Sequence, residues 1–250
     1  MKKAVIITGA SSGTGYTIAE KFASEGYNIF LTSRSQADAD AAAERIRQRF
    51  PVEVKGYQLS GKADRDVYEM FSDIEGMEVS LKTIVLNAAD LGMNMPCLTA
   101  EIDAFRRVLE TNLCWNFLLA QQAALQMREG GGAIVFIGSN TCRRAIKNRS
   151  AYIASKGGIL SLSKALAVEL GEYQIRVNTV IAGSIKTSRW ELLDEEGKAQ
   201  KKRRVPIGDI ADFEDIANAA WFLGSELSGN VTGAEIVVDG GADAQLFPGS

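Results

Sequence analysis

Histidine is absent from this 250-residue chain, and cysteine and proline are scarce. Without histidine, any mechanism that needs a Ser–His pair, a Cys–His pair or a histidine–metal site is excluded, so proton transfer must use Tyr, Lys, Asp, Glu or Cys. The three cysteines are odd in number and widely spaced, which fits neither a disulfide framework nor a zinc site. We therefore expect reduced thiols in a cytoplasmic protein, with Cys97 and Cys114 packed as small apolar residues.

The chain also lacks a large excess of charge and a long apolar run. Its formal net charge is -3, whereas a protein that binds nucleic acid needs a clustered basic face. No apolar stretch approaches the ~20 residues that span a bilayer, and no secretory signal pattern follows Met1. We expect neither nucleic acid nor a membrane as a partner, and no metal site.

Short apolar runs rich in β-branched residues alternate with helical patterns along the chain. The predicted strands are 4–8, 28–32, 83–86, 133–137, 176–180 and 235–238, with a weaker one at 52–55, and the clearest helical patterns are 37–50, 101–128, 151–170 and 212–227. Strands that are apolar on both faces are typical of a parallel sheet covered by helices on each side. The pattern predicts an α/β, single-domain Rossmann fold over 1–250, with a doubly wound parallel seven-stranded sheet. The polar stretch 184–209 breaks the rhythm and is predicted to be a substrate-loop insertion.

A glycine-rich turn directly follows the first strand. The turn runs from Thr8 to Gly15, and a helix is expected from Tyr16. Glycines allow a sharp turn and close approach to a pyrophosphate, and the helix N-terminus supplies N–H groups and positive dipole. The predicted cofactor-binding residues of this turn are Gly9, Ser11, Ser12, Gly13, Thr14 and Gly15.

The end of the second strand discriminates between the two nicotinamide cofactors. A carboxylate at this point would bind the ribose 2′-OH of NAD and repel a 2′-phosphate, but the sequence has Arg34 between two serines. A guanidinium can form charge-assisted hydrogen bonds to a 2′-phosphate. The sequence therefore favours NADP(H), with NAD(H) as the alternative.

A serine, a tyrosine and a lysine form the candidate catalytic group. Ser139 follows the predicted strand 133–137 after one glycine. Tyr152 and Lys156 are four residues apart at the start of a helix, so they share one face of it. A free tyrosine has a pKa of about 10, too high for efficient acid–base work at neutral pH, and a nearby ammonium lowers it. Ser139 can hold the substrate oxygen beside Tyr152.

With these residues in place, the chain resembles the short-chain dehydrogenase/reductases over nearly its whole length. Thr8–Gly15 matches the family's TGxxxGxG, Asn87–Ala89 stands at its NAG, and Asn112 falls on its helix asparagine. The resemblance implies that Tyr152 is the general acid–base, Lys156 its pKa modulator and ribose ligand, Ser139 the substrate orienter and Asn112 a proton-relay residue. It further implies cofactor contacts from Asn87, Gly183, Ile185 and Thr187, and assembly as a homotetramer or homodimer through helices 101–128 and 151–170 and the last strand.

Four positions depart from the family pattern. Ala89 replaces the last glycine of NAG, Ala182 replaces the proline before Gly183, Leu59–Ser60 replaces the aspartate that ends the third strand, and Ser12 stands where NADP-preferring members often carry a basic residue. The last departure weakens the NADP prediction without reversing it.

The substrate and one alternative function stay open on the sequence alone. The small-molecule carbonyl or alcohol could be a sugar or polyol, a steroid or a 3-oxoacyl thioester. The basic group Arg143, Arg144 and Lys147 would attract an acidic substrate or merely be solvated, and Cys142 would face the substrate or pack. A catalytically silent dinucleotide-binding sensor or scaffold is the alternative function, but such proteins usually lose the tyrosine or the lysine. Related lyases and epimerases usually carry a larger C-terminal domain.

Overall fold

A single parallel sheet organises the structure, a computed structural model that describes residues 1–61 and 63–246. The strands are β1 (Lys2–Ile7), β2 (Asn28–Ser33), β3 (Val54–Gln58), β4 (Val79–Leu86), β5 (Gly132–Ser139), β6 (Ile175–Ala182) and β7 (Glu235–Val238). Their order is β3-β2-β1-β4-β5-β6-β7, with every neighbouring pair parallel. The predicted seven-stranded, doubly wound sheet is confirmed. Residues 247–250 of the predicted 1–250 domain lie outside the described residues.

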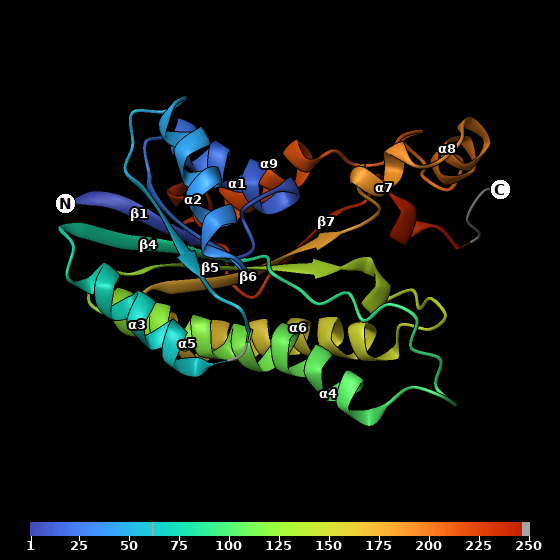
Figure 1. Cartoon of the computed structure of the whole chain (residues 1–250), viewed down its shortest axis with the longest axis horizontal. Helices are drawn as coiled ribbons and strands as arrows, with labels where there is room; N and C mark the ends of the chain where they lie inside the picture. The colour runs from blue at the N-terminus through green and yellow to red at the C-terminus, as the bar shows by residue number, and fades with distance from the viewer. Residues whose placement is uncertain (62, 247–250) are drawn as a thin grey trace.

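Helices cover both faces of this sheet (Figure 1). They are α1 (Gly13–Ser24), α2 (Gln36–Arg47), α3 (Asp64–Glu75), α4 (Ile102–Leu109), α5 (Trp115–Met127), α6 (Ser150–Glu169), α7 (Ser188–Glu191), α8 (Glu195–Lys202) and α9 (Phe213–Gly224). One apolar core lies between the sheet and α3, α5 and α6, and the other between the sheet and α1, α2 and α9. Because both faces are buried, the central strands are apolar throughout.

The direction in which successive strands are added to the sheet reverses between β1 and β4, since β2 and β3 lie on one side of β1 and β4–β7 on the other. The turns that follow β1 and β4 therefore diverge at the carboxyl edge of the sheet, and at this point open α/β sheets have the crevice in which they bind ligands. Figure 1 shows α7 and α8 projecting beyond this edge, at the opposite end of the molecule from the N-terminus.

Two helical segments differ from the sequence prediction. The pattern at 101–128 predicts one helix, whereas the structure has α4 and α5 joined by a π-helical stretch at Glu110–Cys114. The stretch 184–209 contains α7 and α8, and Trp190, Val205 and Ile210 form a small apolar cluster of their own. This insertion is a folded element with its own core rather than an irregular loop.

Two of the three cysteines lie on the surface of the protein. Cys97 and Cys114 are both exposed, so the prediction that they pack as small apolar residues is wrong. Cys97 lies in the loop after β4 and Cys114 points outward from the π-helical stretch, away from either core.

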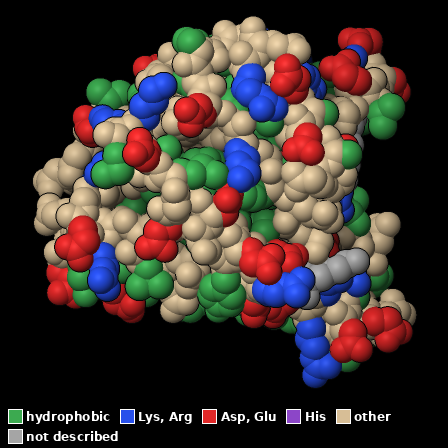
Figure 2. Space-filling model, turned by 60° about the vertical axis from the view of Figure 1, so that its left-hand side comes forward, with side chains coloured by type: hydrophobic (Ala, Val, Ile, Leu, Met, Phe, Trp, Pro, Cys, Tyr) green, Lys and Arg blue, Asp and Glu red, His purple; other side chains and the backbone are tan. Residues whose placement is uncertain are grey.

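Figure 2 shows basic and acidic side chains interspersed across the face in view. Among the described residues, no helix has the length and apolar character required to cross a membrane.

Candidate functional site

The turn between β1 and α1 has a backbone shape that only glycine adopts easily. Gly9 and Gly13 have positive φ angles of 62° and 56°. A Cβ on Gly15 would lie 2.3 Å from the Gly9 carbonyl oxygen, so this position has no room for a side chain. Ser12 precedes α1 in extended conformation and its side chain makes no capping hydrogen bond. The first N–H groups of α1 are thus available to an external acceptor, and the turn fits a pyrophosphate.

Side chains from the neighbouring strand hold this turn in place. The Thr8 hydroxyl accepts hydrogen bonds from the backbone N–H groups of Asn87 and Ala88, at 2.9 and 3.0 Å. In return, the Asn87 amide donates to the carbonyl oxygens of Thr8 and Gly9, at 3.0 and 3.1 Å. The two turns that border the crevice therefore fix each other.

The end of β2 brings hydroxyl and guanidinium groups to the same turn. Ser33 donates to the Ser11 hydroxyl at 3.2 Å, and Ser35 caps α2 by accepting from the Asp38 N–H at 3.4 Å. Arg34 is exposed next to them, with no ion pair among the described residues. Leu59, where the family pattern has an aspartate, is buried and its N–H donates to Ser33. The corner formed by the ends of β2 and β3 and the start of α2 therefore has no carboxylate directly at the end of either strand.

Arg45 of α2 also reaches this corner, which the sequence analysis missed. Its guanidinium donates to the Ser11 carbonyl oxygen at 2.8 Å and lies 4.4 Å from the centre of the Tyr16 ring. Arg45 is eleven residues beyond Arg34 in the sequence, in the last turn of a charged helix, so no local motif marks it. A second guanidinium thus lies beside the Ser11–Ser33 pair. It brings a positive charge to this part of the site, where Ser12 replaces the basic residue that NADP-preferring relatives often carry.

Asn112 is fully buried in the π-helical stretch and joins three segments. Its amide oxygen accepts from the Asp90 N–H at 2.7 Å, and its amide nitrogen donates to the Asp90 carbonyl at 2.8 Å and to the Ser155 hydroxyl at 3.0 Å. Its own carbonyl accepts from the Asn116 side chain at 2.8 Å. The π-helical turn lets one side chain bond both the loop after β4 and the helix α6.

Ser139, Tyr152 and Lys156 lie together at the carboxyl end of β5 and on the facing turns of α6. The Ser139 hydroxyl accepts from the Thr141 hydroxyl at 3.0 Å and interacts with the Tyr152 phenol. Lys156 is 2% exposed, its ammonium donates to the Ile137 carbonyl at 2.7 Å, and it lies 5.8 Å from the centre of the Tyr152 ring. The three side chains that the sequence singled out are brought together.

Burial governs the acid–base properties of this group. Because burial disfavours an ammonium, the pKa of Lys156 is lowered to about 8. Burial raises the pKa of Tyr152, and the Ser139 hydroxyl and the Arg149 guanidinium oppose this rise only in part. The sequence predicts a lowered tyrosine pKa, and the direction in this structure is the opposite, because burial of the phenol outweighs the neighbouring groups that lower its pKa.

The chain after β6 borders the other side of the crevice. A Cβ on Gly183 would lie 2.4 Å from the Asp239 Cβ, so glycine is needed where β7 passes. Ile185 pairs with Ala211, and Thr187 precedes α7 in extended conformation. Gly183, Ile185 and Thr187 thus lead from the sheet into the 184–209 insertion.

The basic group after Ser139 divides in the structure. Arg143 pairs with Glu235 and with Asp243, the latter at 2.8 Å, and Arg144 donates to the Ala242 carbonyl. Both side chains therefore tie the segment after β5 to the C-terminal segment, which leaves Arg143 neutralised rather than open to an acidic substrate. Cys142 is partly buried, its thiol bonds the Ser139 carbonyl, and burial raises its pKa.

Comparison with known proteins identifies the family. Residues 9–243 match a family model described as enoyl-(acyl carrier protein) reductase. The chain is 32% identical over 247 residues to trans-4-hydroxycyclohexanecarboxylate dehydrogenase of Sinomonas cyclohexanicum, covering 97% of this chain and 93% of the relative. It is 31% identical over 240 residues to the 3-oxoacyl-acyl-carrier-protein reductase FabG of Aquifex aeolicus, with 96% of both chains covered.

Among solved structures, a 7α-hydroxysteroid dehydrogenase complexed with NADH and 7-oxo glycochenodeoxycholic acid superposes with a TM-score of 0.89 at 29% identity, covering 98% of this chain and 96% of that one. Similarity of this extent spans the turn, the crevice and the Ser139–Tyr152–Lys156 group. The chain belongs to the short-chain dehydrogenase/reductase family and is an NAD(P)-dependent oxidoreductase acting on CH–OH and C=O groups.

Proposed function

We propose that this protein catalyses reversible hydride transfer between NADP(H) and a small-molecule ketone or secondary alcohol, with Tyr152 as the general acid–base. One observation carries the proposal: the Tyr152 phenol lies beside the Ser139 hydroxyl and close to the buried Lys156. The distance from the Lys156 ammonium to the centre of the Tyr152 ring is 5.8 Å. These groups lie at the carboxyl edge of the sheet, where the glycine turn opens. When bound, the nicotinamide supplies or accepts the hydride.

Each residue of the group has a distinct role in this proposal. Ser139 hydrogen-bonds the substrate oxygen, and Tyr152 gives its proton to that oxygen during reduction or takes it during oxidation. Lys156 would hold the ribose hydroxyls of a bound cofactor, and its positive charge near the Tyr152 ring would favour the phenolate. Asn112 orders the path by which Lys156 exchanges protons with solvent.

The remaining cofactor contacts follow the shape of the crevice. The pyrophosphate would be held by the turn residues Gly9, Ser11, Ser12, Gly13, Thr14 and Gly15. Asn87 would shape the adenosine side, and the nicotinamide would be held by Gly183, Ile185 and Thr187. Residues 1–250 act as one catalytic domain in which 184–209 closes over the substrate. The scarcity of cysteine supports a cytoplasmic location.

A preference for NADP(H) rests on the corner formed by β2 and α2. Arg34 and Arg45 offer two positive charges to a 2′-phosphate, and the Ser11 hydroxyl, which accepts from Ser33, offers a hydrogen-bond donor. No carboxylate ends β2 to bind a free ribose 2′-OH. Arg45 supplies from α2 the charge that Ser12 does not supply from the turn.

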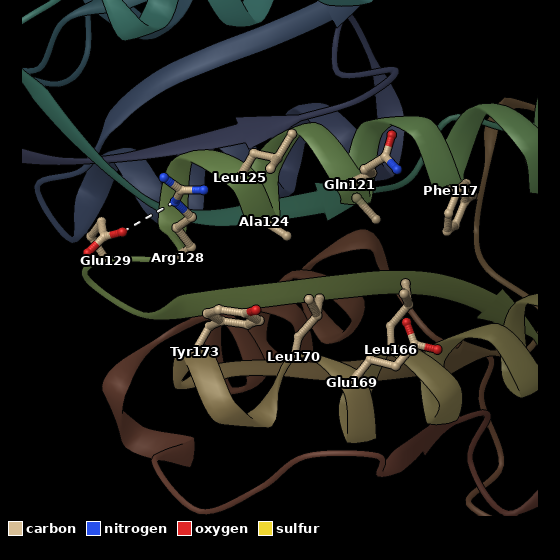
Figure 3. Close-up of a pocket in the computed structure, with 11 residues that line it drawn as sticks. Phe117, Gln121, Ala124, Leu125, Arg128, Glu129, Leu166, Glu169, Leu170 and Tyr173 are labelled. Atoms are coloured by element: carbon tan, nitrogen blue, oxygen red, sulfur yellow. Dashed lines mark ion pairs between the residues drawn. The ribbon is translucent and has the colours of Figure 1, made fainter.

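We further propose a homotetramer or homodimer that associates through α5 and α6. Figure 3 shows a groove between these helices that is lined mainly by apolar side chains. Its volume is about 490 Å³. Phe117, Leu125 and Tyr173 are 43%, 54% and 41% exposed there, and a second copy would cover them. Sedimentation of the wild-type protein and of a Leu125→Glu variant tests this: the variant should dissociate to a smaller species.

The central experiment follows the absorbance of NADPH while the protein is mixed with a panel of ketones. The wild-type protein is expected to oxidise NADPH with at least one carbonyl, whereas Tyr152→Phe binds NADPH with unchanged affinity and turns over at least ~1000-fold more slowly. A wild-type protein that binds NADPH tightly but reduces no carbonyl would instead favour a dinucleotide sensor or scaffold.

A further inference from the structure

Of the basic residues that follow Ser139, one remains turned toward the catalytic group. Arg149 is the residue before α6, three positions before Tyr152, and it is partly buried. The centre of its guanidinium lies 5.8 Å from the centre of the Tyr152 ring, and one of its N–H groups donates to the Leu91 carbonyl. A substrate whose oxygen bonds Tyr152 therefore lies within a few covalent bonds of this cation.

Neighbouring acids do not neutralise Arg149. None of the ion pairs within residues 1–61 and 63–246 includes it. Asp90, on the loop that Arg149 contacts, instead pairs with Arg107 at 3.4 Å and accepts from the Gly92 N–H at 2.9 Å. Among these residues Arg149 thus has no acidic partner beside the phenol, whereas Arg143 is paired with Glu235 and Asp243.

The local backbone reinforces this positive charge. Arg149 is the N-cap of α6, a helix of 20 residues that has no acidic residue in its first turn and no side-chain cap. The positive end of the helix dipole and the guanidinium therefore act in the same direction. A guanidinium has five N–H donors, and the Leu91 carbonyl takes one of them. The other donors suit a carboxylate, which a guanidinium can bind in a bidentate manner.

We propose that Arg149 is the anion-binding residue of the substrate pocket, and that the substrate is an oxo acid or hydroxy acid with a carboxylate a few bonds from the reacting carbon. This inference rests on the proposed function, because it uses Tyr152 to place the reacting oxygen. The carboxylate takes no part in the redox change; it fixes which carbon lies next to the phenol.

The position of Arg149 between two loops supports this role. Its backbone pairs with Met95, and the Met95 N–H donates to the Asn148 carbonyl at 3.1 Å. The segments that follow β4 and β5, which border the crevice on the substrate side, are therefore joined at Arg149. With its backbone paired to Met95 and its guanidinium bonded to the Leu91 carbonyl, Arg149 loses less conformational freedom when it binds an anion.

The test compares each acid with its own neutral derivative. NADPH-loaded enzyme is given 4-oxopentanoate, 4-oxocyclohexanecarboxylate and longer oxo acids, each beside its methyl ester. Wild type should prefer an acid to its ester in kcat/KM. Arg149→Met should lose roughly 10- to 100-fold on the acid and change little on the ester, and Arg149→Lys should recover part of the loss. Lys147→Met, which alters an exposed basic residue two positions away, is the matched control and should change neither rate.

A binding measurement separates this inference from the proposed function. Calorimetry with cyclohexanecarboxylate and with cyclohexanecarboxamide on the NADP-loaded enzyme needs no turnover. Tighter binding of the carboxylate that Arg149→Met abolishes supports the anion site even if no ketone is reduced. Equal binding of acid and amide by the wild-type protein overturns it, even if ketones are reduced. An equal loss of kcat/KM on acids and esters in Arg149→Met, with a shifted pH profile, also overturns it, because Arg149 would then act only on Tyr152.

Discussion

The glycine turn (8–15) and the segments that follow β4, β5 and β6, here called the substrate rim, lie at the same edge of the sheet, yet they are held by different forces. At the turn, backbone and short side chains interlock: four hydrogen bonds join Thr8 and Gly9 after β1 to Asn87 and Ala88 after β4, and Gly15 has no space for a Cβ. At the rim, long charged side chains join separate segments, as when Arg143 pairs with Glu235 and Asp243.

This difference matches what each region binds. A dinucleotide phosphate is the same in every reaction, so a rigid backbone cradle is sufficient to hold it. Substrates vary, and residues on loops and on the 184–209 insertion can change while the sheet remains unaltered. Changes at the turn should therefore affect stability and cofactor affinity together, whereas changes at the rim should affect the substrate alone.

Gly15→Ala should have the largest effect, because the new Cβ meets the Gly9 carbonyl at 2.3 Å and the Ala10 Cα at 2.9 Å. Backbone must move, so we expect a loss of about 3 kcal/mol of stability or more and a fall in NADPH affinity of roughly 100-fold. Thermal unfolding and fluorescence titration measure the two effects. Gly76→Ala is the control, since its nearest neighbour lies at 3.5 Å on the surface. Normal affinity in Gly15→Ala would contradict a rigid cradle.

Lys156, in the catalytic group, weakens the fold of the cofactor-free protein. Its folded-state pKa of about 8 is below that of an unfolded lysine, so folding requires a buried ammonium at neutral pH. Lys156→Met should therefore stabilise the cofactor-free protein at pH 7, by up to about 3 kcal/mol.

The pH dependence of this gain has a definite sign. Between pH 8 and about 10.4 the unfolded protein binds more protons than the folded one, so the stability of wild type rises relative to the variant and the gain disappears above that range. Denaturant unfolding of both proteins across pH measures it, with Lys201→Met as an exposed control. A gain that did not vary with pH would mean that packing, not charge, is its source.

What the sequence could predict follows the same division. The strand pattern and the glycine turn depend on local residue types, so the sheet and the positions of Gly9, Gly13 and Gly15 could be predicted. Tyr152 and Lys156 were placed together because helical spacing is regular.

Residues that depend on tertiary contacts could not be predicted from pattern. Arg45 reaches the turn only because α2 packs beside α1, and Arg143 is neutralised by acids about 100 positions away in the sequence. The π-helical stretch at Glu110–Cys114 likewise leaves no mark in the apolar periodicity of 101–128. Exposed Cys97 and Cys114 show that composition does not fix burial.

Arg34→Ala tests whether the cofactor corner discriminates through charge. We expect the ratio of kcat/KM with NADPH to that with NADH to fall roughly 10- to 100-fold, because a charge-assisted bond to the 2′-phosphate is lost while the pyrophosphate cradle is intact. Arg45→Ala should lower the same ratio by a smaller factor, since Arg45 is already partly used on Ser11. Arg47→Ala, on the same helix and paired with Glu44, serves as the control. An unchanged ratio in Arg34→Ala would mean that the corner does not select NADP.

Trp190→Ala should have the smallest effect on the whole fold, because Trp190 packs in a cluster with Val205 and Ile210 that is separate from both main cores. Trp115→Ala is the matched comparison: both tryptophans are 7% exposed, but Trp115 lies in the core beneath α5. We expect Trp190→Ala to raise the KM for substrate by roughly tenfold or less, with little change in NADPH affinity or thermal unfolding. Trp115→Ala should lose roughly 3 kcal/mol of global stability. If the two variants unfolded at the same temperature, the insertion would be part of the main folding unit, and the contrast between rigid turn and adaptable rim would not hold.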